Sequence, residues 1–333
     1  MSINIIKQTA ALAKIKFLAQ SDLNDMDLVI RERLLTKAQL VQDVTYHIIN
    51  SGGKRLRPIL LILIAKLFGY QEKRHINLAA SVEFIHTATL LHDDVVDHSN
   101  LRRGKLTANK HWDNKSSILV GDFLFSQSFL LMSEDNDIKV LQILSKAASI
   151  IAEGEVRQLA SIANLSVNIE DYLQIISAKT AELFAASCQV GSVVANSDPQ
   201  SQLAMYNFGL NLGIAFQIMD DVLDYMASKV AIGKNIGDDF REAKVTLPII
   251  LAYHNSNQQE KEFWQRTICQ KNQHDQDFDL ALEIFDKYKI TAKCLELAEE
   301  FTNKAKKCID IAPNNQIKSS LIELLNFSIS RSF

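Results

Sequence analysis

Apolar residues recur every three or four positions along most of the chain, which is the spacing that places them on one face of an α-helix. The stretch from Leu173 to Gly191 is typical, with apolar or small residues at positions 173, 176, 180, 183, 184, 188 and 191. No stretch alternates convincingly between apolar and polar residues as a half-buried β-strand does. The pattern predicts an all-α protein.

Short polar or glycine-containing breaks divide the chain into about a dozen predicted helices. The breaks fall at residues 51–58, 100–105, 133–137, 194–199, 227–239 and 255–259. Because no linker rich in Pro, Gly or Ser separates two halves, residues 1–333 are predicted to form a single domain. Only 11 Gly and 4 Pro interrupt 333 residues, which favours long helices.

The composition limits where in the cell the protein is expected and which classes of partner it is expected to bind. A formal net charge of -3 argues against a nucleic-acid-binding protein, which would need an excess of Lys and Arg. The four cysteines show neither a close pair nor a zinc spacing, so no disulfide is expected and a reducing, cytoplasmic location is predicted. The longest apolar runs are too short to span a bilayer, and the N-terminus resembles an amphipathic helix rather than a secretory signal.

Two aspartate motifs carry the strongest chemical signal. They are "HDDVVD", with Asp93, Asp94 and Asp97, and "MDDVLD", with Asp220, Asp221 and Asp224. With 23 aspartates in the chain, one D-D-x-x-D match is expected by chance about 0.1 times. Residues four apart share a helix face, where like charges repel unless a cation binds them. Since Mg²⁺ takes a few carboxylates and completes its shell with water and phosphate, a magnesium site is predicted in preference to a solvated helix face.

Basic residues near the helix breaks supply a phosphorylated substrate with counter-charges. Any one of these cations alone would more often be a surface residue, but with two aspartate motifs they favour a diphosphate site. "GGKRLRP" suits the first turn of a helix, where backbone N–H groups attract anions. Lys179, beside Thr180, lies in an otherwise apolar helix, an expensive position unless it faces an anion. His86 and Gln217 could equally be interior residues with satisfied hydrogen bonds. The cations are Lys54, Arg55, Arg57, Arg102, Arg103, Lys179, Lys234 and Lys244.

The ordered series of motifs resembles the trans-isoprenyl diphosphate synthases (polyprenyl synthetases), especially their long-chain, octaprenyl-forming bacterial members. It runs from "SGGKRLRP" through "VEFIHTATLLHDDVVD", "RRGK", "VGDFLF", "IAEGEV", "KTAELF", "FQIMDDVLDY" and "GKNIGDD" to "KVTLPII", and so lies within residues 51–250. The resemblance implies one all-helical bundle around a deep central cavity, the isoprenoid synthase fold, and a homodimer. The function it implies is prenyl transfer in isoprenoid biosynthesis.

Residue by residue, the resemblance implies two diphosphate subsites and three Mg²⁺ ions. All six motif aspartates are candidate metal-site residues, with Asp93, Asp97 and Asp220 as direct ligands and Asp94, Asp221 and Asp224 as ligands or their partners. Asp93, Asp97, Asp220, Lys179 and Lys234 are the candidate catalytic residues. The isopentenyl diphosphate is assigned to Lys54, Arg57, His86 and Arg103. The allylic diphosphate is assigned to Arg102, Lys179, Thr180, Gln217, Lys234 and Lys244.

The implied reaction is a 1'-4 condensation driven by electrostatic stabilisation of the departing pyrophosphate, without a protein nucleophile. Large aromatics four or five residues before the first motif give short products in this family. Thr89 and Ala88 stand there, so a long product is predicted, octaprenyl diphosphate from a farnesyl diphosphate primer. A quinone (ubiquinone) side chain is the expected use, with a peripheral membrane contact during product release.

Some positions depart from the family pattern. Ala243 stands where glycine is common, His98 where an acid is common, and Ser228 and Lys229 where an acid or glycine is common. These departures bear on loop closure and on metal affinity.

Four other functions remain open from the residues. They are a shorter-chain synthase, a terpene cyclase or head-to-head condensing enzyme, a non-catalytic subunit of a heteromeric synthase, and a purely structural helical protein. The "GGKRLRP" and "RRG" elements speak against the cyclase, because they serve a second diphosphate. The two intact aspartate motifs speak against the non-catalytic subunit.

Overall fold

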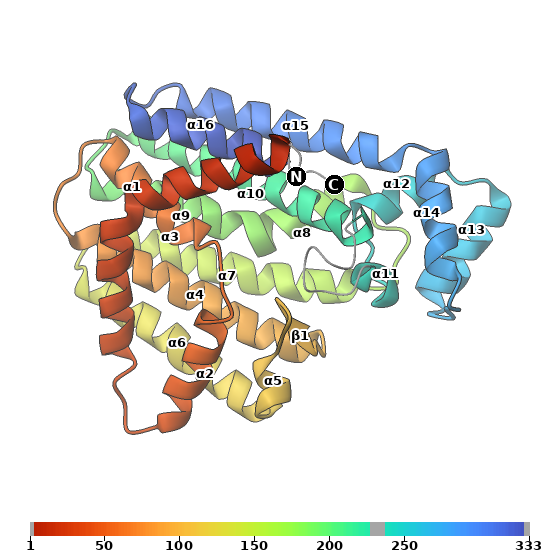
Figure 1. Ribbon diagram of the computed structural model, residues 1–333, viewed down its shortest axis with the longest axis horizontal. Coiled ribbons are helices and arrows are strands. Elements are labelled where there is room, and N and C mark those ends of the chain that lie inside the picture. Colours follow the sequence, from red (N-terminus) through yellow and green to blue (C-terminus); the bar gives the residue numbers. More distant parts are fainter. Residues whose placement is uncertain (1–2, 227–236, 330–333) are drawn as a thin grey trace.

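The computed structural model describes residues 3–226 and 237–329, and the backbone within these ranges is almost entirely helical (Figure 1). Two short π-helical turns, η1 (Ser177–Ala181) and η2 (Gln265–Cys269), interrupt the helices, and one small hairpin joins β1 (Leu101–Arg102) to β2 (Lys105–Leu106). The α-helices are α1 (Ile3–Arg33), α2 (Gln39–Ile49), α3 (Leu56–Leu67), α4 (Arg74–Val96), α5 (Ala108–His111), α6 (Asn114–Glu134), α7 (Ile138–Ser161), α8 (Ile169–Ile176), α9 (Glu182–Val194), α10 (Pro199–Met226), α11 (Asp238–Arg241), α12 (Leu247–Asn255), α13 (Gln258–Trp264), α14 (Asp277–Lys287), α15 (Ile290–Ile309) and α16 (Gln316–Ile329).

The all-α prediction is confirmed, with two differences in detail. Short helices such as α5 and α11 raise the number of helices above the predicted dozen, because single turns leave little periodicity in a sequence. The break at residues 100–105 is a hairpin rather than an irregular loop. Its two central residues, Arg103 and Gly104, both have positive φ, as in a tight type I′ turn.

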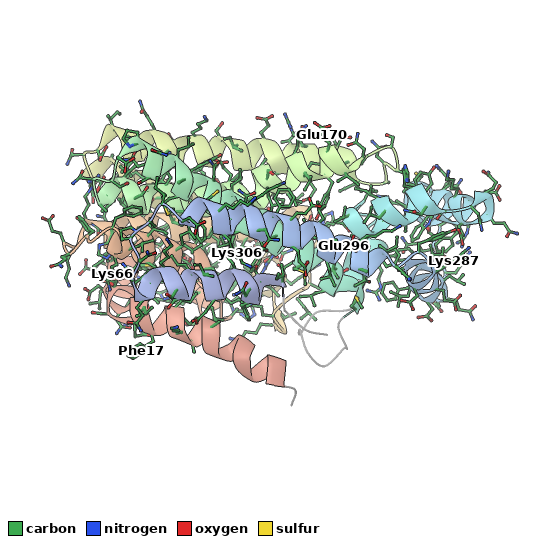
Figure 2. The ribbon with its side chains drawn as sticks, turned by 90° about the horizontal axis from the view of Figure 1, so that it is seen from above. Phe17, Lys66, Glu170, Lys287, Glu296 and Lys306 are labelled. Carbon is green, nitrogen blue, oxygen red and sulfur yellow. The ribbon has the colours of Figure 1, made fainter. Side chains whose placement is uncertain are left out.

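The long helices pack around α3, α4, α9 and α10. Helix α3 is surrounded on nearly all sides, which explains its continuous apolar run, and α9 packs along both α3 and α10. Figure 2 shows α16 between α1 and α15, and these helices cover one side of the bundle. Gly209 allows α10 to approach α9, because a Cβ atom there would lie 2.4 Å from the carbonyl oxygen of Phe184.

Two hydrophobic clusters fill the interior. The larger contains side chains from α1 to α4, α6, α7 and α9, and the smaller contains side chains from α8, α10, α12 and α13 to α15. Helix α10 contributes to both, with Phe208 in the first and Met219 in the second. The carboxyl half of α10, which carries the second aspartate motif, is therefore held by packing on several sides.

Helix α6 is, in the described part of the chain, the single helix whose length and composition would suit a membrane span, and 39% of its apolar window is buried within the protein. The sequence predicts no such span, because its longest apolar runs are shorter than the roughly 20 residues that span a bilayer. In the structure α6 packs along α4, and a core helix meets the same criterion. All four cysteines are free thiols.

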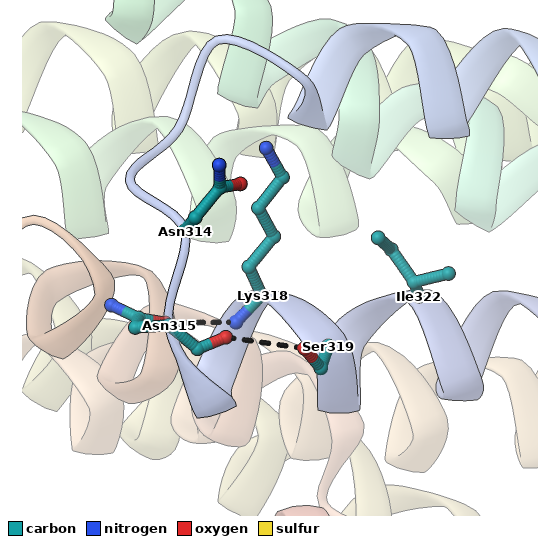
Figure 3. A pocket seen from close by; sticks show the side chains of 5 residues that line it. All are labelled: Asn314, Asn315, Lys318, Ser319 and Ile322. Carbon is teal, nitrogen blue, oxygen red and sulfur yellow. Dashed lines mark hydrogen bonds between the residues drawn. The ribbon is translucent and has the colours of Figure 1, made fainter.

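The loop between α15 and α16 borders a shallow pocket lined by Asn314, Asn315, Lys318, Ser319 and Ile322 (Figure 3). The ammonium of Lys318 donates to the carbonyl oxygens of Asp310 and Ala312, at 2.9 and 3.0 Å. It therefore closes the carboxyl end of α15, where free carbonyls and the helix dipole favour a cation. None of the lining residues belongs to an aspartate motif.

Candidate active site

The aspartate motifs lie at the carboxyl ends of two long helices. The first ends α4, with Asp97 as its C-cap, and the second lies in the last turns of α10. His98, which follows the first motif, has φ of 50° and closes α4 in the left-handed conformation. A helix carboxyl end carries partial negative charge, so carboxylates there need nearby cations.

Asp94 is paired inside the protein. It is 1% exposed, and its carboxylate accepts hydrogen bonds from Arg102 Nε at 3.0 Å and Nη2 at 2.7 Å. The β1–β2 hairpin holds Arg102 in this position. The sequence predicts Asp94 as a metal-site residue and Arg102 as a ligand of the allylic diphosphate, whereas here the two neutralise each other.

Asp93 and Asp97 each face a lysine. Lys179 Nζ lies 3.9 Å from Asp93, and Lys244 Nζ lies 3.3 Å from Asp97 and 2.6 Å from Glu242. Burial raises the pKa of Asp93, against the opposing effect of Lys179. Burial lowers the pKa of Lys244, but the carboxylates around it, Asp97 first, raise that pKa overall. Lys244 therefore stays charged beside the first motif.

Lys179 lies in the π-helical turn η1, where its ammonium is held by α7. Its Nζ lies 2.6 Å from Glu155 Oε2 and 2.5 Å from Gln158 Oε1. Gly154 makes this contact possible, because a Cβ atom there would lie 2.7 Å from the backbone nitrogen of Lys179. Burial, followed by the charge of Asp93, raises the pKa of Glu155 to about 7.

Glu155 and Gln158 are candidate site residues that the sequence does not predict. The segment "IAEGEV" contributes to the family resemblance, but no role is assigned to it from spacing alone. The signal is the prediction for Lys179, which requires an anion beside a lysine in an apolar helix. Glu155 provides that anion.

Protein side chains also donate hydrogen bonds to one aspartate of the second motif. Asp221 is 5% exposed, and its two oxygens accept hydrogen bonds from Tyr172 Oη at 2.6 Å and Gln217 Nε2 at 2.7 Å. Gln217 in turn accepts a hydrogen bond from Thr180 Oγ1 at 2.8 Å. Burial raises the pKa of Asp221 to about 7, while both hydrogen bonds oppose the shift.

The other two aspartates of the second motif do not contact Tyr172 or Gln217 in the hydrogen bonds described above. Asp224 Oδ2 accepts a hydrogen bond from the backbone N–H of Asp239 at 2.9 Å, and its carbonyl oxygen accepts one from Gly237. Asp224 therefore anchors the start of α11. Asp220 is exposed at the surface of α10 and is near enough to Arg57 to raise the pKa of that guanidinium.

A second group of basic residues surrounds the amino end of α3. As predicted, Arg57 and Pro58 lie in its first turn. Arg57 Nη1 donates to His86 Nε2 at 3.2 Å, and its guanidinium lies 4.4 Å from the ring centre of Phe184. Burial lowers the pKa of Arg57 to about 10, and burial with the neighbouring arginines lowers the pKa of His86 well below its usual value. His86 is therefore a neutral acceptor.

Glu83 is the buried counter-charge of this group, and the sequence reasoning missed it. It lies one turn before His86, and Oε2 is buried without a hydrogen-bond partner. Burial raises the pKa of Glu83, and Arg55, Arg57 and Arg103 lower it. A charged residue within the apolar run "VEFIH" was the available signal.

Lys54 and Arg103 approach the same group from neighbouring loops. Lys54 Nζ lies 5.7 Å from the ring centre of Phe216 and 5.8 Å from that of Phe327. A Cβ atom on Gly53 would lie 3.1 Å from Arg103 Nη1, so this glycine leaves room for the guanidinium. Arg55 differs, because it turns away to pair with Asp27 of α1 at 2.5 Å.

Lys234, Ser228 and Lys229 lie outside the described residues. Of the positions that depart from the family pattern, Ala243 is described, and it is buried with φ of 56°. That backbone conformation is the one that favours glycine, which gives a physical reason for the family preference. Ala88 is fully buried, and Thr89 is half-buried with its hydroxyl bonded to the carbonyl oxygen of His86 at 2.8 Å.

The donor set fits a hard divalent cation that binds together with a phosphorylated substrate. In residues 3–226 and 237–329, no three His, Cys, Asp or Glu side chains converge closely enough to hold an ion alone. Mg²⁺ commonly uses only one or two carboxylates together with water and substrate phosphate. Asp93, Asp97 and Asp220 fit that mode, although Lys244 bonds one oxygen of Asp97. Both carboxylate oxygens of Asp94 and of Asp221 already accept hydrogen bonds from the protein.

Comparison with protein families gives one match, in which the polyprenyl synthetase model aligns with residues 38–285. The chain is 38% identical over 320 residues to octaprenyl diphosphate synthase of Escherichia coli, covering 96% of this chain and 99% of that protein. It is 37% identical over 311 residues to an all-trans-nonaprenyl-diphosphate synthase (geranyl-diphosphate specific) of Rhodobacter capsulatus, covering 93% and 95%.

Solved structures of polyprenyl synthases also superpose closely on this chain. A decaprenyl diphosphate synthase from Rhodobacter capsulatus superposes with a TM-score of 0.93 at 42% identity, covering 96% of this chain and 99% of that one. A polyprenyl synthase from Caulobacter crescentus, complexed with calcium and isoprenyl diphosphate, also gives 0.93, at 45% identity and with 96% and 98% coverage. The predicted isoprenoid synthase fold and the family resemblance are confirmed.

Proposed function

The chain belongs to the polyprenyl synthetase family and is a prenyltransferase, and from this premise we propose that it extends an allylic diphosphate with successive isopentenyl diphosphate units. One observation carries the proposal. The structure holds two groups of cations, one beside the aspartate motifs (Lys179, Lys244) and one at the amino end of α3 (Arg57, Arg103). Two anion subsites suit a reaction between two diphosphates.

We propose Mg²⁺ as the cofactor, three ions with both substrates bound, held by Asp93, Asp97 and Asp220. The Caulobacter relative was solved with calcium, another hard cation that prefers oxygen ligands. When bound, the metal supplies positive charge that stabilises a departing pyrophosphate.

The basic residues beside the motifs serve the allylic diphosphate. Lys179 and Lys244 now neutralise carboxylates, and a diphosphate oxygen between the motifs gives each ammonium a further acceptor. Positive charge fixed there favours breakage of the allylic C–O bond, with the electron pair leaving on the pyrophosphate. The isopentenyl double bond then attacks the allylic cation, and loss of a proton restores a double bond.

The cations at α3 serve the isopentenyl diphosphate. Arg57 is held by His86 on one side and by the Phe184 ring on the other, so its guanidinium is oriented before substrate binds. His86 accepts from Arg57 through Nε2, which leaves Nδ1 as a donor for a phosphate oxygen. Lys54 and Arg103 complete this subsite.

The small residues before the first motif support a long product. We propose octaprenyl diphosphate made from farnesyl diphosphate, for a quinone side chain, in the cytoplasm. Ala88 is fully buried one to two turns before Asp93, and its small side chain is proposed to leave room for a growing prenyl chain. The apolar interior between α4 and α6 keeps water from the allylic cation.

The experiment is a condensation assay with labelled isopentenyl diphosphate, farnesyl diphosphate and Mg²⁺. We expect incorporation that depends on metal and on both substrates, and a loss of at least about 100-fold in kcat for Asp93→Ala and for Asp220→Ala. Asp286→Ala, on the exposed side of α14, is the control that keeps activity. A folded wild-type protein that incorporates no label with any allylic primer would contradict the function.

We also propose a homodimer formed through α6 and α7. These helices pack against each other, and both expose large apolar side chains. The most exposed are Leu119 on α6 and Ile138, Val156 and Leu159 on α7, with 65%, 68%, 68% and 58% exposed. Apolar side chains exposed along two neighbouring helices favour contact with a second copy of the chain. A membrane surface is the alternative partner for these side chains, and an experiment must distinguish it from a second copy of the chain.

A further inference from the structure

Both oxygens of the Asp221 carboxylate accept hydrogen bonds from protein side chains. Tyr172 Oη donates to one oxygen at 2.6 Å and Gln217 Nε2 donates to the other at 2.7 Å. Asp221 and Tyr172 are only 5% and 3% exposed. A buried carboxylate needs such donors, so this arrangement is a fixed part of the fold rather than a surface contact.

The hydrogen bonds continue from Asp221 toward the allylic subsite. Gln217 uses its amide NH₂ on Asp221, so its oxygen is directed at the hydroxyl of Thr180, 2.8 Å away. Thr180 follows Lys179 in the π-helical turn η1. A side chain on α8 is thus connected through α10 to the turn that carries a candidate catalytic lysine.

Helix α8 holds Tyr172 firmly in this position. Its first turn is closed by a capping box, in which the side chains of Asn168 and Asp171 each bond the backbone of the other. Tyr172 follows directly, and its ring lies in the smaller hydrophobic cluster. The hydroxyl therefore reaches Asp221 from a rigid element, as precise positioning requires.

We propose that Tyr172 is a positioning residue of the allylic diphosphate subsite, acting through Asp221 and Gln217 on Thr180 and Lys179. Asp221 then serves to orient these side chains and is not a metal ligand. The proposal rests on the proposed function, since that function assigns Thr180 and Lys179 to the allylic diphosphate. The test separates orientation from ligation, because removing a competing donor would free an oxygen of a ligating aspartate.

The test variant is Tyr172→Phe, which removes one hydroxyl and keeps the ring. Tyr206→Phe is a matched control, because Tyr206 Oη donates to Glu182 at 2.8 Å, about three turns before Gln217 on α10 and outside both motifs. Calorimetry measures the binding of inorganic pyrophosphate in the presence of Mg²⁺. Steady-state kinetics give KM for farnesyl diphosphate and for isopentenyl diphosphate, and thermal melting reports stability.

Tyr172→Phe is expected to weaken pyrophosphate binding and to raise KM for farnesyl diphosphate by about tenfold, the order expected for loss of a hydrogen bond to a charged group. KM for isopentenyl diphosphate stays at the wild-type value, because Arg57 and His86 are outside this network. Tyr206→Phe leaves all three quantities unchanged. A purely structural role of Tyr172 would lower the melting temperature without separating the two KM values.

Two results would overturn the proposal. One is pyrophosphate binding and KM values in Tyr172→Phe that equal those of Tyr206→Phe. The other is tighter metal-dependent binding in Tyr172→Phe, as expected if Asp221 were a ligand released from a competing donor. A wild-type protein that binds no magnesium pyrophosphate would instead contradict the proposed function itself. Should Tyr172→Phe melt far below the wild type, Thr180→Val tests the far end of the same network, with the same expected split in KM.

Discussion

Glu155 illustrates how a single side chain shapes the site. It holds Lys179 at 2.6 Å, and burial together with the charge of Asp93 raises its pKa to about 7. A lysine held between Glu155 and Asp93 is ready to move a short distance onto a substrate phosphate. Lys179 therefore has a defined resting position before any ligand binds.

The raised pKa gives a stability prediction for the metal-free protein. Between about pH 4.5 and about pH 7 the folded state holds more protons at Glu155 than the unfolded state, so the stability contributed by this group falls as pH rises. Glu155→Gln removes that dependence. We expect the variant to gain about 1–3 kcal/mol relative to wild type between pH 4.5 and pH 8, measured by denaturant unfolding with a chelator present. Parallel stability curves for the two proteins would contradict the prediction.

Ala88 is the residue on which product length is predicted to depend. Ala88→Phe places a ring in the fully buried position one to two turns before Asp93, so we expect a shorter product by mass spectrometry and a loss of about 1–3 kcal/mol in stability from overpacking. Ala79→Phe is the control, because Ala79 is equally buried but nine residues away, on the opposite face of α4. Equal product lengths for Ala88→Phe and wild type would contradict the assignment.

At the scale of elements, the site depends on where helices end and where they approach closely. Both aspartate motifs lie at carboxyl ends of helices, and η1 is a π-helical turn, a feature that is frequent at functional sites. Gly154 lets α7 touch this turn. Sequence periodicity predicts the helices and the faces that the aspartates share. It does not reveal the π-helical turn or the partners Glu155, Glu83 and Tyr172, because these contacts join residues far apart in the chain.

Gly154→Ala tests the contact between α7 and η1. In an ordinary helix this change stabilises by about 1 kcal/mol, but a Cβ atom here would lie 2.7 Å from Lys179 N and 2.8 Å from Ala178 Cβ. We therefore expect a loss of about 1–3 kcal/mol and a raised KM for farnesyl diphosphate. A variant that is more stable than wild type and has the same KM would show that the close contact is unimportant.

At the scale of the whole molecule, the sequence predicts the fold class well, because long amphipathic helices and ordered motifs are local signals. The sequence does not predict which charged groups pair: Asp94, a predicted metal ligand or partner of a ligand, and Arg102, predicted for the allylic diphosphate, bond each other in this structure. Which cation neutralises which carboxylate depends on the three-dimensional arrangement of α4, the hairpin and α10. Outer surfaces such as that of α6 and α7 likewise emerge only when the helices are packed.

Leu119→Glu tests the proposed dimer. A carboxylate within the proposed apolar interface is expected to dissociate the dimer into monomers, seen by light scattering during size-exclusion chromatography. Leu35→Glu, at a leucine beyond α1 that is 77% exposed, is the control that leaves the mass unchanged. A monomeric wild type that binds lipid vesicles and loses this binding in Leu119→Glu would assign the patch to a membrane instead.

The mass of the product tests the central claim most directly. Wild-type protein is incubated with Mg²⁺, farnesyl diphosphate and an excess of isopentenyl diphosphate, and the extracted prenyl diphosphates are measured by mass spectrometry. Two cation groups beside intact aspartate motifs, with Ala88 and Thr89 in place of large aromatics, predict octaprenyl diphosphate as the main product. Recovery of unextended farnesyl diphosphate from a folded, metal-loaded protein would contradict the synthase function, and a main product of geranylgeranyl diphosphate would contradict the proposed chain length.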